Sequence, residues 1–136
     1  MKTLVIYYSY SGTTRIHALE IAEKHNAEVY EVKDIKKPGK LKAYVIGSFK
    51  AMSGKKMPIE PTAIDLSLYE NIIILTPIWA SHPVPQIYNI FDMLPSDKKI
   101  EFYAVSASGA SNKQKVEEII KNKSCELVNY TDIKTR

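Results

Sequence analysis

The run Thr3-Leu4-Val5-Ile6-Tyr7-Tyr8 leads directly into Ser9-Tyr10-Ser11-Gly12-Thr13-Thr14. The first six residues are mostly apolar and predict a buried β-strand. The next six place Ser and Thr hydroxyls around one glycine, just before a segment with helical character. A helix N-terminus presents unpaired N–H groups and a partial positive charge, and hydroxyl side chains add further donors. The stretch therefore predicts a strand, a phosphate-binding loop and a helix, which is the start of an α/β fold.

The composition of this loop narrows the kind of phosphate. Four Ser and Thr side chains and no lysine suit a phosphate monoester better than a triphosphate with Mg²⁺. The chain contains neither G-x-x-x-x-G-K-[ST] nor G-x-G-x-x-G. The strand ends in Tyr8-Ser9 rather than in an acid pair, which argues against a receiver domain, and no cysteine stands in the loop, which excludes a cysteine-based phosphatase.

Apolar strand-like runs alternate with helix-like segments along the 136 residues, which predicts one α/β domain, 1–136, with a mainly parallel sheet. The expected strands are 3–8, 27–32, 71–76, 100–105 and 125–130. The expected helices are 13–25, about 41–52, 84–94 and 112–122.

Two helices have a predicted buried face. The first helix is expected to bury Ile16, Leu19 and Ala22, or a neighbouring helical phase. The second is expected to contribute an apolar stripe to the core, formed by Leu41, Tyr44, Val45, Phe49 and Met52. In the sheet, Ala27–Glu31 alternates with charged residues as an edge strand does, whereas Ile72–Leu75 is apolar on both faces as a central strand is.

Two later loops also carry a ligand-binding pattern. The third strand ends in Thr76-Pro77-Ile78-Trp79-Ala80, and three prolines in residues 76–85 predict a stiff loop in which Trp79 can flank a planar ring. Ser106-Ala107-Ser108-Gly109 follows the fourth strand as a small, hydroxyl-rich turn before a helix. Because the carboxyl ends of parallel strands lie at one edge of a sheet, the three loops are expected to meet there.

Together the three loops resemble those of the flavodoxin family, over about residues 1–131. The resemblance implies a three-layer sandwich with a five-stranded parallel sheet in the order 2-1-3-4-5, and bound FMN. The first loop is similar to the family's phosphate loop, the second to the loop beside the flavin ring, and the third to the loop whose N–H groups face the pyrimidine edge. The FMN-binding residues implied are Ser9, Tyr10, Ser11, Gly12, Thr13, Thr14, Thr76, Pro77, Ile78, Trp79, Ala80, Ser106, Ala107, Ser108 and Gly109. The resemblance implies no catalytic side chain.

The chain also departs from the family pattern. The third loop has no aromatic residue, so one ring face is open or is covered by another residue or a partner subunit. Ala80-Ser81 stands where many flavodoxins have glycine. The chain ends soon after the fifth strand, so one face of the sheet is expected to be thinly covered, and a homodimer is one way to cover it.

Charge and cysteine content bear on partners and location. The net charge of +4 is concentrated in residues 33–56, which hold lysines 33, 36, 37, 40, 42, 50, 55 and 56 and one acid, Asp34. This region is either a solvated face or a docking surface for an acidic redox partner. It has few aromatic residues and no recognition motif, which argues against nucleic acid. The single cysteine, Cys125, and the absence of a signal peptide or membrane-spanning run favour a cytoplasmic protein without membrane partners. Cys125 and the three histidines lack metal-ligand spacing.

Three functions fit these observations. The first is an FMN-binding electron-transfer protein of flavodoxin type. The second is an FMN-dependent NAD(P)H:acceptor reductase for a quinone or flavin, which the open ring face favours. The third is a flavodoxin-like interaction module without flavin, which the departures favour.

Overall fold

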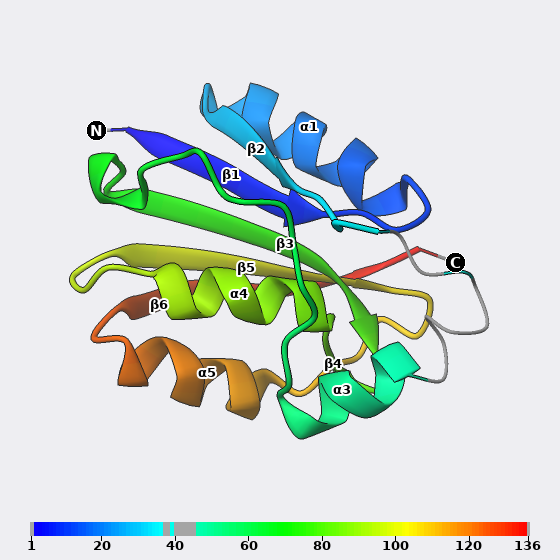
Figure 1. Cartoon of the computed structure of the whole chain (residues 1–136). Coiled ribbons are helices and arrows are strands. Elements are labelled where there is room, and N and C mark those ends of the chain that lie inside the picture. Colours follow the sequence, from blue (N-terminus) through cyan, green and yellow to red (C-terminus); the bar gives the residue numbers. More distant parts are fainter. Residues whose placement is uncertain (1, 37–38, 40–45, 136) are drawn as a thin grey trace.

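The computed structural model describes residues 2–36, 39 and 46–135 of the chain (Figure 1). Five long strands form one parallel sheet in the order β2-β1-β3-β5-β6. Their bounds are β1 (Thr3–Tyr8), β2 (Glu28–Val32), β3 (Asn71–Trp79), β5 (Lys99–Ser106) and β6 (Glu126–Lys134). A two-residue strand, β4 (His82–Pro83), pairs antiparallel with the end of β3. The five long strands thus have the predicted 2-1-3-4-5 order, and β2 is the predicted edge strand.

Helices cover both faces of the sheet. Helix α1 (Thr13–His25) lies on one face, and α4 (Pro85–Met93) and α5 (Lys113–Asn122) lie on the other (Figure 1). Two short segments are α3 (Ser48–Ser53) and the 3₁₀ turn η2 (Leu66–Leu68). None of the helices within the described ranges is long and apolar enough to cross a lipid bilayer.

The central strands are buried on both faces because successive side chains point to opposite sides of a sheet. In β1, Leu4, Ile6 and Tyr8 face the core under α4 and α5, whereas Val5 and Tyr7 face α1. Ile72–Leu75 of β3 is fully buried, as its two-sided apolar pattern predicts.

Helix α1 packs through small side chains rather than through its larger ones. Thr14, Ala18 and Ala22 are buried, whereas Ile16 and Leu19 are 62% and 50% exposed. The expectation was correct for Ala22 and wrong for Ile16 and Leu19. Small residues let the helix backbone approach the sheet closely, so the neighbouring helical phase faces the core.

The predicted apolar stripe of the second helix is not a core surface where the structure describes it. Phe49 and Met52 are 60% and 53% exposed, and Ala51 is the buried residue of α3. Leu41, Tyr44 and Val45 lie outside the described residues. Helix α3 has six residues, which is less than two turns. Over this length only Ala51 is buried against the core.

Two strands, β3 and β6, extend by several residues beyond their predicted ends, and β5 extends by one residue at each end. β3 runs three residues further, to Trp79, because the chain reverses there and pairs with β4. β6 continues to Lys134 in register with Ser106. Both extensions carry side chains to the carboxyl-terminal edge of the sheet.

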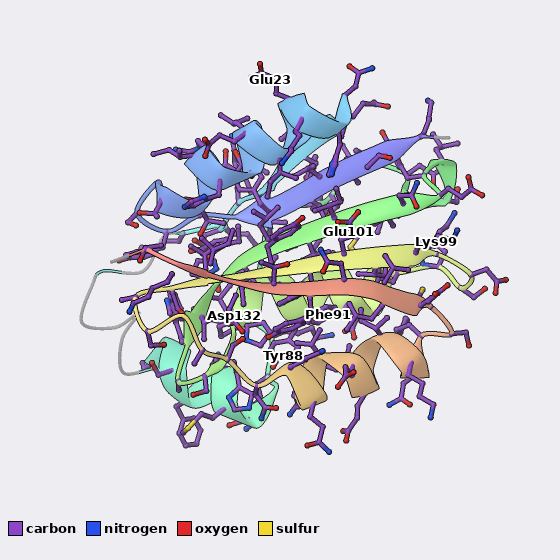
Figure 2. All side chains as sticks on the ribbon, turned by 180° about the vertical axis from the view of Figure 1, so that it is seen from behind. Glu23, Tyr88, Phe91, Lys99, Glu101 and Asp132 are labelled. Atoms are coloured by element: carbon purple, nitrogen blue, oxygen red, sulfur yellow. The ribbon has the colours of Figure 1, made fainter. Side chains whose placement is uncertain are left out.

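One face of the sheet is only partly covered. Seen from the side of α1 in Figure 2, no described helix lies over β5 and β6. A groove of about 720 Å³ separates α1 from this face, with Tyr103 and Ile133 on the sheet side and Glu101 beside them. The thin cover predicted from the sequence is therefore present over these two strands.

Candidate functional site

The three predicted loops meet at the carboxyl ends of β1, β3 and β5. Between them lies a cleft of about 230 Å³ that opens to solvent. Its lining residues are Tyr10, Ser11, Thr13, Thr14, Pro77, Ile78, Trp79, Val105, Ser106, Ala107 and Thr135. β1 and β3 are neighbours in the sheet from which the chain winds in opposite directions, and this is where open α/β sheets bind ligands.

Ser9 shapes the first loop. Its Oγ accepts hydrogen bonds from the N–H groups of Gly12 (3.0 Å) and Arg15 (3.2 Å), while Gly12 takes a left-handed backbone with φ of 104°. The turn leaves the N–H groups of Thr13 and Thr14, at the start of α1, without an acceptor in the described part of the chain. These two N–H groups, together with the Ser11 and Thr13 hydroxyls, form a donor-rich rim at the positive end of the helix.

The second loop holds Trp79 in a defined position. Its indole meets the Tyr10 ring edge-on, with 5.9 Å between centroids. It also lies against the backbone of Gly47, where a Cβ would stand 2.4 Å from the nearest indole carbon. Thr76 is fully buried, and its hydroxyl donates to the Pro77 carbonyl and accepts from the Val84 N–H. Thr76 thus connects β3 to α4 and does not line the cleft.

The turn that follows Trp79 is strained. Ala80 and Ser81 have φ of 51° and 68°, the left-handed region that glycine favours, and they form the two-residue connection of the β3–β4 hairpin. The turn is fastened by His82 Nδ1, 2.7 Å from the Ala80 carbonyl oxygen, and by the Asn112 N–H, which donates to the Ser81 carbonyl. Such conformations cost on the order of 1–3 kcal/mol each and cluster at ligand sites.

The third loop repeats the construction of the first. Ser106 Oγ accepts from the Gly109 N–H at 3.0 Å, the same spacing and distance as Ser9 and Gly12. Gly109 also has a left-handed backbone, with φ of 72°. Ser106 and Ala107 line the cleft, whereas Ser108 and Gly109 form the outer part of the turn.

Of the predicted site residues, the structure places nine around the cleft and six behind or beside it. Those beside it are Ser9, Gly12, Thr76, Ala80, Ser108 and Gly109. Two lining residues were missed, Val105 and Thr135. Thr135 reaches the cleft because its N–H donates to the Ser106 carbonyl at 2.9 Å. Alternating β-branched residues at Thr131, Ile133 and Thr135 carry the signal that could have extended the last strand this far.

A polar network anchors the base of the first loop. The Tyr8 hydroxyl donates to Asp34 Oδ2 at 2.6 Å, and Gln86 Nε2 donates to Asp34 Oδ1 at 2.9 Å. Burial raises the pKa of Tyr8 well above its ordinary value, and the hydrogen bond to Asp34 raises it further. Tyr8 directly precedes Ser9, so the network fixes the strand end from which the loop starts.

Comparison with known proteins supports the fold. No protein-family model and no curated protein sequence matches the chain. Among solved structures, a flavoprotein from Lactobacillus acidophilus in complex with FMN is 25% identical, with a TM-score of 0.75 over 95% of this chain and 91% of that chain. Flavodoxin 2 from Bacillus cereus is 15% identical, with a TM-score of 0.58 over 98% of this chain and 84% of that chain. A flavodoxin from the domain Archaea is 15% identical, with a TM-score of 0.60 over 100% of this chain and 86% of that chain.

These likenesses and the strand order define a flavodoxin-like α/β fold. The resemblance seen in the three loops of the sequence is therefore confirmed at the level of the fold.

Proposed function

We propose that this protein is a cytoplasmic FMN-binding electron carrier of flavodoxin type. The observation that carries the proposal is the cleft itself, in which a hydroxyl-rich helix start and an indole face each other across the ends of β1, β3 and β5. The similarity to a flavoprotein solved with FMN supports the choice of ligand.

The residues present fit FMN. The N–H groups of Thr13 and Thr14 and the adjacent hydroxyls would hold the phosphate, and Trp79 would flank the ring. FMN would supply the redox chemistry, and the protein its position and electrostatic surroundings. The cleft of about 230 Å³ is smaller than the roughly 300–1,000 Å³ of pockets that enclose a whole ligand. Part of the ring would thus stay exposed, as electron transfer to a protein partner requires.

The first test is the preference for FMN over riboflavin. Thr14→Val keeps the shape of this buried side chain and removes the hydroxyl. We expect FMN binding to weaken by about 1.5–3 kcal/mol, the range for a hydrogen bond to a charged group, while riboflavin binding stays unchanged. Fluorescence titration of both ligands measures this, with Thr131→Val on β6, away from the cleft, as the matched control. Equal affinity of the native protein for the two ligands would contradict the phosphate assignment.

The second test separates the carrier from the NAD(P)H-dependent reductase. A reductase must orient a nicotinamide against the ring, and the sequence has no dinucleotide-binding motif. We therefore expect slow reduction of the FMN-loaded protein by NADPH in stopped-flow mixing, and faster reduction by a partner reductase. Saturable bleaching of the flavin at roughly 1 per second or faster would favour the reductase. A folded protein that binds no FMN would instead favour the interaction module.

The proposed docking surface for an acidic redox partner is the lysine-rich region 33–56. Its described lysines are 33, 36, 50, 55 and 56, and most of them are exposed. Lys56 pairs with Asp92 at 2.6 Å, so its charge is partly compensated within the chain.

A homodimer is a further proposal, in which a second copy of the chain would cover the partly open face over β5 and β6.

A further inference from the structure

The end of β6 closes the cleft on the side of the third loop. The aliphatic stem of Lys134 lies over Gly109, where a Cβ would be 3.0–3.4 Å from three of its carbons. The next residue, Thr135, donates its N–H to Ser106 and lines the cleft. Ser111 donates to Asp132 Oδ1 at 2.5 Å and so fastens the end of the loop to the same strand. The third loop is thus attached to β6 and to the residue that follows it, and the Ser111 hydroxyl also lies 2.5 Å from the Tyr130 hydroxyl of β6.

This placement puts a lysine beside the third loop, next to the cleft-lining Thr135 and on the side of the cleft away from the phosphate loop. In the order β1-β3-β5-β6, Lys134 is three strands away from the loop that follows β1. At about 4.8 Å per strand the separation is roughly 14 Å. The charge of Lys134 therefore acts mainly on the ring end of a ligand whose phosphate lies at Thr13 and Thr14.

Lys134 forms no ion pair with the carboxylates of the described residues. Asp132, two residues earlier on the same face of β6, accepts from Ser111, and its carboxylate opposes part of the charge of Lys134 without pairing with it. An exposed lysine without a counter-ion attracts additional negative charge at the site beside it.

We infer that the positive charge of Lys134 stabilises the reduced form of FMN in this cleft. The inference rests on the proposed function. Reduction by two electrons, with uptake of one proton, gives the bound ligand one more negative charge. Lys134 stays protonated and donates no proton. Its attraction for the added charge tightens binding of the reduced form relative to the oxidised form, and this raises the midpoint potential.

The effect is expected to be moderate because the ammonium group is exposed and partly screened by solvent. We expect the reduced ligand to lose fivefold to tenfold more affinity than the oxidised ligand when the charge is removed. For a two-electron couple this corresponds to a decrease of about 20–30 mV in the midpoint potential.

The experiment compares Lys134→Met, which keeps the stem over Gly109, with Lys134→Glu and with a matched control. The control is Lys99→Met, which removes the same charge at the start of β5. Figure 2 shows Lys99 at the end of the sheet away from Asp132. The midpoint potential of the FMN-loaded protein is measured by dithionite titration against a reference dye at low and high salt. The affinity for oxidised FMN is measured by fluorescence.

We expect Lys134→Met to lower the potential, Lys134→Glu to lower it further, Lys99→Met to leave it unchanged, and high salt to shrink the shifts. A shift for Lys134→Met no larger than that for Lys99→Met would overturn the inference. So would an equal loss of affinity for both forms, which would show a packing role alone. Native protein that is folded but binds no FMN would overturn the proposed function and the inference with it, whereas the first two outcomes leave FMN binding intact.

Discussion

Gly47→Ala is expected to displace the indole of Trp79 and to weaken FMN binding nearly as much as Trp79→Ala does. The added Cβ would stand 2.4 and 2.7 Å from two indole carbons, distances at which the ring must move. Stacking of an aromatic side chain on a planar base contributes about 1–3 kcal/mol, so Trp79→Ala should lower the affinity by about one to two orders of magnitude. Fluorescence titration with FMN gives both affinities, and the residual quenching reports whether the indole still contacts the ring.

Gly39→Ala is the matched control, because a Cβ there meets nothing within 4 Å. It should bind FMN as the native protein does. If Gly47→Ala kept native affinity and quenching while Trp79→Ala lost both, the indole would have enough freedom to avoid the new methyl group. If Trp79→Ala changed only stability, Trp79 would be an anchor of the hairpin rather than a wall of the flavin site.

The contact between Gly47 and Trp79 also shows where sequence reasoning ends. Trp79 was predicted as a site residue because it follows a buried strand and stands in a proline-rich run, and both features are local. Its partner Gly47 lies more than 30 positions earlier in a segment with no ligand-binding pattern. Only the tertiary structure brings the two together, since a glycine that accommodates a ring has no signature in its own neighbourhood.

The order of the sheet was predictable because alternating strands and helices with right-handed crossovers leave few arrangements. The three loops were predictable because each follows a strand end, two of them with small hydroxyl residues and the second with prolines and Trp79. The contribution of residues 131–135 to the site was not predicted. Thr131, Ile133 and Thr135 alternate as in a strand, but the charged residues between them weaken this signal. Pairing with β5 sets the conformation as far as Lys134. Thus Thr135 reaches the cleft, and Lys134 reaches the third loop, through register rather than through any motif.

For a related reason, the buried face of α1 is the neighbouring helical phase that the sequence left open, rather than the phase with Ile16 and Leu19. Hydrophobicity favoured Ile16 and Leu19 as core residues, yet α1 lies against the sheet through Ala18 and Ala22. The gain from burying a large side chain competes with the gain from bringing a whole helix closer to the sheet. In α1 the closer approach of helix to sheet determines the packing. Periodicity alone does not show which of two adjacent helical faces will be buried.

Asp34→Ala is expected to destabilise the protein by about 2–4 kcal/mol, although Asp34 belongs to no predicted element or motif. Its two carboxylate oxygens accept from the Tyr8 hydroxyl and from Gln86 Nε2, and both donors belong to residues almost or fully buried. Removing the carboxylate leaves these donors without their charged acceptor, and each buried group left unsatisfied costs about 1–3 kcal/mol. The expected loss in the free energy of unfolding is smaller than the sum of the upper limits for two unsatisfied donors, because Asp34 is partly accessible to water.

Urea unfolding measures the change, and Asp65→Ala is its control. Asp65 is an exposed aspartate that accepts from the Ser67 N–H and hydroxyl within its own turn, so its removal leaves no buried donor unpaired. Its effect should be clearly smaller. Tyr8→Phe tests which donor matters, because it removes the Tyr8 hydroxyl, which then no longer requires an acceptor. If the Asp34 carboxylate serves mainly to satisfy Tyr8, Asp34→Ala should cost much less in the Tyr8→Phe background than in the native protein. Additive effects would instead show that Gln86 is the partner through which Asp34 holds β2, β1 and α4 together.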